Sequence, residues 1–185
     1  MNNQIKGGAI LSYIALFLKI AIAFVYTPFV LKSLGQAEYG LFALVNTTIS
    51  HFTILDFGFG NAIIRYTAKF NAQNDKIKEQ SLHGMFLILY LFIGIITYIL
   101  GLIITLNIDT IFAKSLAEIN IHTAKTLMFL ATLNMAISFP FSIFPSIIKA
   151  YEKFIFFQWT QVVRVILNPL LMVSVLMLGY RSIGM

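Results

Sequence analysis

The segment Leu55-Asp-Phe-Gly-Phe-Gly-Asn-Ala-Ile-Ile-Arg-Tyr66 separates a long apolar run from a basic one. Gly58 and Gly60 lack a Cβ atom, so the backbone can bend at them or approach another helix closely. Asp56 and Arg65 place opposite charges on the two sides of this glycine joint. The pattern predicts a hinge at the point where the chain leaves a membrane.

Asp56 has two interpretations in this segment. As a capping residue, its carboxylate would accept hydrogen bonds from the free N–H groups of a short interfacial helix that runs to about Asn71. Alternatively, the carboxylate contacts a substrate directly. Both interpretations place Asp56 near the end of a membrane span.

The composition is typical of a membrane protein. The 185 residues are 59% hydrophobic and 11% charged, whereas soluble globular domains carry about 25% charged residues, and the mean hydropathy is +0.87. The net charge of +6 comes from basic residues at the ends of apolar runs. There they fit topology signals and contacts with anionic lipid better than a nucleic-acid site. The lack of cysteine excludes disulfides, metal thiolates and thiol catalysis.

Five stretches are apolar enough to cross a bilayer, which takes roughly 20 residues for a hydrocarbon core about 30 Å thick. The first stretch is not a cleavable signal peptide, because it is too long and carries Lys19 in its middle. The sequence therefore predicts an all-α integral membrane protein, a bundle of five transmembrane helices at residues 8–31, 38–57, 82–106, 121–148 and 154–178.

Lys19 is the first candidate site residue. Helical spacing places it on one stripe with Ser12, Ala15, Ala23 and Tyr26. An ammonium group near the middle of a span is costly unless it is paired or hydrated, and such groups often mark substrate or ion pathways. The alternative is a lysine that packs or extends its amine to the membrane surface.

Arg164 is the second candidate. Thr160, Gln161 and Asn168 share a helical face with it, just ahead of Pro169. A guanidinium group stays charged at every physiological pH, so within a span it needs an anion, a carboxylate or water. We therefore take Arg164 and Gln161 as residues of a polar cavity.

Spans two and three differ in polarity. In the second span Asn46, Ser50 and Thr53 recur at helical spacing and form a narrow polar stripe, which makes Asn46 a further cavity candidate. The third span carries a stripe of small residues and no charge, which favours close helix packing over a polar pathway. That stripe consists of Gly94, Thr97, Gly101 and Thr105.

The fourth span is expected to be kinked. Pro140 and Pro145 each remove an N–H donor and disturb a carbonyl group one turn earlier. Membrane helices tolerate this where neighbours, water or a cavity satisfy the freed groups. A polar stripe repeats every fourth residue through the same span, at Asn134, Ser138, Ser142 and Ser146.

The distribution of basic residues predicts a cytoplasmic N-terminus by the positive-inside rule. Residues 65–80 then form an amphipathic connector on the inner side, and residues 180–185 lie outside without a terminal domain, so we expect an incomplete protein. The inner side holds Lys6, Arg65, Lys69, Lys76, Lys78, Lys149 and Lys153, against Lys32, Lys114, Lys125 and Arg181 outside.

Polar stripes on spans one, two, four and five together indicate a hydrated cavity. Its positive members, Lys19 and Arg164, favour an anionic ligand over a cation. The residues alone indicate a multi-span helical protein with a basic polar cavity and do not identify the cargo.

Several segments resemble the N-terminal part of Wzx-like polysaccharide flippases, in the polysaccharide transporter branch of the multidrug/oligosaccharidyl-lipid/polysaccharide superfamily. The resemblance covers the whole chain, and its most specific elements are Leu-Gly-x-x-x-Tyr-Gly and Asp-Phe-Gly-Phe-Gly-Asn. It rests on Tyr26-Thr-Pro-Phe-Val-Leu-Lys-Ser-Leu-Gly-Gln-Ala-Glu-Tyr-Gly-Leu-Phe42, Asp56-Phe-Gly-Phe-Gly-Asn-Ala-Ile-Ile-Arg-Tyr66, Ala150-Tyr-Glu-Lys-Phe154 and Leu167-Asn-Pro-Leu-Leu171 with the Gly-Tyr-Arg-Ser-Ile-Gly ending.

The resemblance implies a transporter of O-antigen or lipopolysaccharide precursors in the bacterial cytoplasmic membrane. Such a protein flips undecaprenyl-diphosphate-linked oligosaccharide by alternating access, contacts membrane lipids, and has a polysaccharide polymerase and glycosyltransferases as candidate partners. The family has two related lobes, so the chain resembles one incomplete N-terminal lobe over residues 1–185. Lys19 or Arg164 would attract the diphosphate, and no cofactor, metal or enzymatic activity is implied.

Two other functions are less well supported by the residues. A cation-coupled small-molecule exporter of the same superfamily would be expected to carry an acidic residue deep in a span, whereas the seven acidic residues fall in predicted loops or near span ends, Asp56 included. A prenyl-phosphate enzyme would need clustered carboxylates that hold Mg²⁺, and the sequence has no paired Asp/Glu motif.

Overall fold

The computed structural model describes residues 2–112 and 121–177, and these residues are almost entirely helical, without a β-strand among them. In chain order the elements are α1 (Asn2–Leu34), α2 (Gln36–Ser50), the 3₁₀ helix η1 (His51–Asp56), α3 (Phe59–Ala72), α4 (Lys76–Leu106), α5 (Ile108–Ile111), α6 (Ile121–Phe141), α7 (Ile143–Ala150) and α8 (Phe154–Met177).

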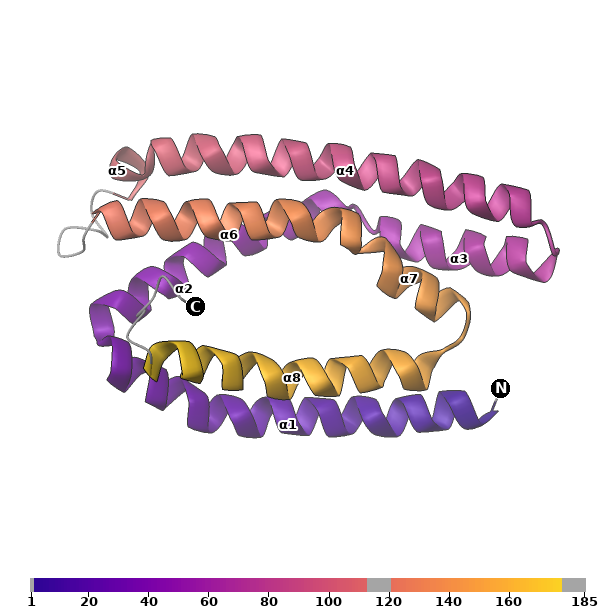
Figure 1. The fold of residues 1–185 in the computed structure, drawn as a ribbon, viewed down its shortest axis with the longest axis horizontal. Coiled ribbons are helices and arrows are strands. Elements are labelled where there is room, and N and C mark those ends of the chain that lie inside the picture. Colours follow the sequence, from indigo (N-terminus) through magenta and orange to yellow (C-terminus); the bar gives the residue numbers. More distant parts are fainter. Residues whose placement is uncertain (1, 113–120, 178–185) are drawn as a thin grey trace.

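The chain runs back and forth along one long axis (Figure 1). The N-terminus, the turn between α3 and α4 and the turn between α7 and α8 lie at one end of the molecule, and the turn between α1 and α2 lies at the other. Helices α1, α4 and α8 therefore run in one direction, whereas the succession α2, η1 and α3 and the pair α6 and α7 return. The basic residues that the sequence placed on the inner side all belong to segments toward the end of the molecule that holds the N-terminus.

Four helical segments are long and apolar enough to cross a membrane, namely Lys6–Leu34, Lys76–Leu106, Ile121–Ala150 and Phe154–Leu176. These agree with an all-α membrane bundle, and their ends lie within six residues of those of four of the predicted spans. The predicted connector at residues 65–80 is a helical hairpin, in which α3 packs along α4 and α4 begins at Lys76. The carboxylate of Asp75 caps α4 by accepting a hydrogen bond from the backbone N–H of Lys78 at 3.0 Å.

The expected span at residues 38–57 is not one regular α-helix, which corrects the prediction of five uniform spans. Helix α2 has 15 residues, and η1 continues it with the tighter 3₁₀ geometry. The hydroxyl groups of Ser50 and Thr53 each donate to the carbonyl oxygen three residues earlier, at 2.7 Å. Such bonds compete with the regular helical pattern. Phe57 and Gly58 then adopt left-handed backbone angles and end η1.

The predicted kink in the fourth span is confirmed as a break between α6 and α7. Pro145 has no N–H to donate to the carbonyl group of Phe141, four residues earlier, and α6 ends at that residue. The backbone N–H of Ser142 donates instead to Phe139, at 3.0 Å. Pro140 lies inside the last turn of α6.

Helices α4 and α6 pack closely along the small-residue stripe predicted from the sequence, and Gly94, Thr97, Gly101 and Thr105 are all buried. A Cβ atom on Gly94 would lie 2.6 Å from the carbonyl oxygen of Ala136, and one on Gly101 would overlap Thr132. Only glycine permits this approach of the two backbones.

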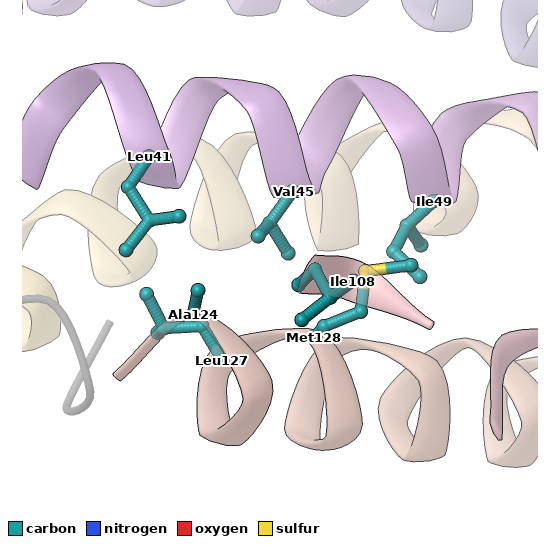
Figure 2. Close-up of a cluster of buried hydrophobic side chains, with 7 residues drawn as sticks. All are labelled: Leu41, Val45, Ile49, Ile108, Ala124, Leu127 and Met128. Atoms are coloured by element: carbon teal, nitrogen blue, oxygen red, sulfur yellow. The ribbon is translucent and has the colours of Figure 1, made fainter. Parts of the chain in front are cut away.

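Helix α2 buries one face against α6. Leu41, Val45 and Ile49 recur every fourth residue, which places them in one line along the helix. Figure 2 shows these three side chains directed at α6, with Ile108 of α5 and Met128 of α6 side by side opposite them. This cluster attaches α2 to the α4–α6 layer.

Helices α1 and α8 form a second layer and run parallel to each other (Figure 1). Gly8 lies against Phe154, and the hydroxyl group of Tyr26 donates to the sulfur of Met172 at 3.0 Å. Both contacts join residues 146 positions apart, so the register is constant along the pair. The main contacts of α1 and α8 outside this pair are with α2 and α7, at the ends of the layer.

Candidate functional site

An open pocket of about 360 Å³, referred to below as the Asp56 chamber, lies where η1, α3, α4, α6 and α7 meet. Its walls contain one carboxylate and five hydroxyl groups. The other three residues, Gly60, Met135 and Phe139, carry no polar side-chain atom apart from the thioether sulfur of Met135. The lining residues are Thr53, Asp56, Gly60, Tyr90, Met135, Ser138, Phe139, Ser142 and Ser146.

Asp56 is the charged residue of this chamber, and it does not cap the following helix. Gly58 occupies the N-cap position of α3 and no side chain caps that helix. The carboxylate of Asp56 instead accepts a hydrogen bond of 2.6 Å from the hydroxyl group of Tyr90, which is fully buried. This contact corrects the capping interpretation.

The contact with Tyr90 also corrects the expected depth of Asp56. Tyr90 lies 14 residues after the start of α4 and 16 residues before its end. At a rise of 1.5 Å per residue it is about 6 Å from the middle of the apolar stretch 82–106. The Asp56 carboxylate, which is hydrogen-bonded to Tyr90, therefore lies near the mid-depth of α4.

The chain bends at the glycine joint, but near the mid-depth of α4 and not at the predicted membrane exit, and the two glycines have different surroundings. Gly58 has φ +76° and nothing near the place of a Cβ atom, so it serves the turn. Gly60 borders the chamber, since a Cβ atom there would lie 3.2 Å from the Ser146 hydroxyl oxygen. Arg65 is exposed on α3, and in the described residues it makes no ion pair with Asp56.

The serine stripe of α6 and α7 supplies much of the chamber wall. Ser138, Ser142 and Ser146 all line it, which is the cavity-side placement expected for the kinked span. Asn134, the first member of the stripe, lines a different pocket of about 290 Å³ between α2 and α6, and Asn46 lines that pocket too. The structure thus separates Asn46 from the chamber of Asp56.

Lys19 and Arg164 lie in the other layer, at the same height. The constant offset of 146 places Lys19 level with Val165, so Arg164 is displaced along the axis by only about 1.5 Å. Both are exposed, and neither has an ion-pair partner in the described parts of the chain. Gln161, one turn before Arg164, is half-buried.

The two basic residues are placed differently around an apolar groove between α1 and α8. The residues of α8 that line the groove include Ile166, two positions after Arg164, which is a rotation of about 200° around the helix. Arg164 therefore lies on the side of α8 opposite the groove. Lys19 instead shares a helical face with Tyr26, seven positions later, which lines the groove.

Arg164 lies on the face of α8 that is directed toward the other layer. Phe157 lies seven residues before Arg164 and so on the same face of α8. The ammonium nitrogen of Lys149, on α7, lies 4.4 Å from the centroid of the Phe157 ring. Because α7 belongs to the layer of α4 and α6 (Figure 1), the face of α8 that carries Arg164 is directed toward it.

A second polar cluster, which no pattern in the sequence had indicated, lies at the basic end of the molecule, where α3 meets α4 and α7 meets α8. Glu79 is only 3% exposed and accepts hydrogen bonds from Tyr151 and from Lys76, the latter at 2.9 Å. The bond to the Glu79 carboxylate raises the pKa of Tyr151. The cluster joins the start of α4 to the turn before α8, and only the segment Ala150-Tyr-Glu-Lys-Phe154 had marked this turn.

Comparison with protein-family models, curated proteins and solved structures finds no match to this chain.

Proposed function

We propose that this chain belongs to a polysaccharide-biosynthesis transporter, which flips undecaprenyl-diphosphate-linked oligosaccharide across the bacterial cytoplasmic membrane by alternating access. The observation that supports the proposal is the pair Lys19 and Arg164, two cationic groups at nearly the same height on the neighbouring helices α1 and α8. A diphosphate is a dense anion, and an ammonium and a guanidinium group at one height suit it.

The arrangement of the rest of the layer fits an amphipathic cargo. The groove between α1 and α8 is lined by apolar side chains and by Tyr26, and it would accept acyl or prenyl chains, while Arg164, Gln161 and Lys19 would contact the head group. In this proposal the N-terminus is cytoplasmic, and the basic ends of α3, α4 and α7 lie on the cytoplasmic side.

The test is substitution of each cation in the gene at its native locus. Lys19→Ala and Arg164→Ala should each abolish surface polysaccharide and leave protein abundance unchanged, because the diphosphate loses a charged partner. Lys19→Arg and Arg164→Lys should keep most of the polymer. Lys32→Ala on α1 and Lys153→Ala before α8 are matched controls, since both residues are exposed near helix ends. Normal polymer in both alanine variants would remove the two residues from the mechanism.

A cation-coupled exporter of small molecules is the second candidate. The position of Asp56 at the mid-depth of α4 favours it, because such a transporter needs an acidic residue within the membrane. Deletion of the gene separates the two candidates. Loss of surface polymer with unchanged drug tolerance supports the flippase, and drug sensitivity with normal polymer supports the exporter.

A further inference from the structure

Lys149 holds a positive charge between α7 and α8 at the basic end of the molecule. It lies in the last turn of α7, and its ammonium nitrogen is 4.4 Å from the centroid of the Phe157 ring on α8. The lysine and the ring are both half-buried, and among the described residues no carboxylate lies within ion-pair distance of Lys149. An aromatic face therefore takes the place of a counter-charge.

The carboxylates at this end leave the charge of Lys149 unbalanced. Asp75 and Glu79 are already paired with lysines at the start of α4, at 2.7 and 2.9 Å. The third carboxylate, that of Glu152, is exposed and forms no ion pair within residues 2–112 and 121–177. A cation–π contact with a phenyl ring is weaker than a charge-assisted hydrogen bond to phosphate. An arriving phosphate group would therefore displace the Phe157 ring as the partner of Lys149.

The ammonium group of Lys149 is also aligned with Arg164 along α8. Phe157 and Arg164 are seven residues apart, so they share a face of the helix and are separated by about 10 Å along its axis. From the basic end inward, the Lys149 charge therefore precedes the Arg164 charge on this face. Successive cations without counter-charges create a field of one sign, which attracts anions and accelerates their association.

We propose that Lys149 binds the anionic head group of a prenyl diphosphate lipid first, as the lipid enters from the basic end and before the head group reaches Arg164. The Phe157 ring keeps the ammonium group in position while no ligand is bound and releases it to the phosphate. This inference rests on the proposed function, and it assigns to Lys149 a role in association of the ligand, whereas Arg164 retains it.

A basic residue in the last turn of a helix also stabilises that helix through its dipole, so the test needs a readout that a structural role would not change. Charges that steer a ligand alter its association rate constant and the salt dependence of that constant, whereas groups that hold the bound ligand alter its dissociation rate constant. Lys149→Ala and Arg164→Ala should therefore change different rate constants.

The test follows the binding of farnesyl diphosphate to the purified full chain in detergent by stopped-flow fluorescence. Trp159 is the single tryptophan of the chain, lies two residues after Phe157 and serves as the reporter. At low salt, Lys149→Ala should lower the association rate constant about three- to tenfold, as one charge of a field that accelerates association tenfold or more. The dissociation rate constant should stay unchanged. The difference should vanish near 1 M salt, where the Debye length is about 3 Å.

The other variants separate charge from structure. Lys149→Gln, which keeps a long polar side chain, should behave like Lys149→Ala, and Lys149→Arg should keep the native rates. Arg164→Ala should mainly raise the dissociation rate constant. Lys153→Ala removes an exposed positive charge four residues away and should change the association rate far less. Farnesol, which has the chain without the anion, should bind the native protein and Lys149→Ala alike.

Thermal unfolding midpoints identify any variant that fails to fold. An unchanged association rate in both Lys149→Ala and Lys149→Gln would overturn the role of Lys149 and leave the proposed function standing, as would an equal fall in Lys153→Ala. If the native chain binds farnesyl diphosphate no better than farnesol, the role of Lys149 and the proposed function are both wrong.

Discussion

Gly94→Ala should destabilise the protein through the contact between α4 and α6. The new Cβ atom would lie 2.6 Å from the carbonyl oxygen of Ala136, whereas ordinary contact begins at 3.4 Å, so the two backbones must separate locally by the difference, about 0.8 Å. The neighbour is backbone and cannot rotate away. Overpacking of this kind costs about 1–3 kcal/mol, and a gap of 0.5–1 Å also forfeits a quarter to a half of each adjoining dispersion contact.

Gly84→Ala is the matched control, since it places the same methyl group in the same helix at a position with nothing within 4 Å. There the substitution should be neutral or stabilising, by up to about 1 kcal/mol from helix propensity. The assay is thermal unfolding of both variants in one detergent, in which 1 kcal/mol corresponds to roughly 2–4 °C for a chain of this size. If Gly94→Ala unfolds no earlier than Gly84→Ala, the close approach of α4 and α6 is wrong.

Two further predictions concern the basic end of the molecule. Tyr151→Phe should lower the free energy of unfolding in denaturant titrations by about 1–3 kcal/mol, because the buried carboxylate of Glu79 loses a donor. Tyr66→Phe, at an exposed tyrosine, is the control. Equal unfolding midpoints of the two variants would contradict the role of the bond between Tyr151 and Glu79. The hydrogen bond and ion pair with Lys78 lower the pKa of Asp75 from its ordinary value of 3.8. The folded chain therefore gains stability above pH 3.8 that disappears as the pH falls through the lowered pKa. The difference in unfolding midpoint between the native chain and Asp75→Asn should vanish in acid. A difference that stays constant with pH would refute this role of Asp75.

Local patterns in the sequence predicted local features well. The glycine and threonine repeat predicted the α4–α6 contact because one face of a helix is fixed by its periodicity. Pro145 predicted the break after α6 because the loss of a donor is a property of the residue itself. The left-handed turn at Gly58 likewise followed from the residue type.

The sequence did not predict the depth of Asp56 or its contact with Tyr90. Both depend on the 3₁₀ geometry of η1, which arises from hydroxyl bonds within the segment, and on which helix lies opposite. Because residues 38–57 are mostly apolar, the sequence predicted one span there, and this prediction placed the Asp56 carboxylate near the membrane surface. The parallel register of α1 and α8 joins residues 146 positions apart, which no pattern within either helix could specify.

The separate layer of α1 and α8 has a mechanical consequence. These helices hold each other along their length and meet the remaining helices chiefly at α2 and α7. A rotation of α1 and α8 about their contacts with α2 and α7 would move the two positive charges, Lys19 and Arg164, together. Their separation along the helix axes would persist through such a rotation.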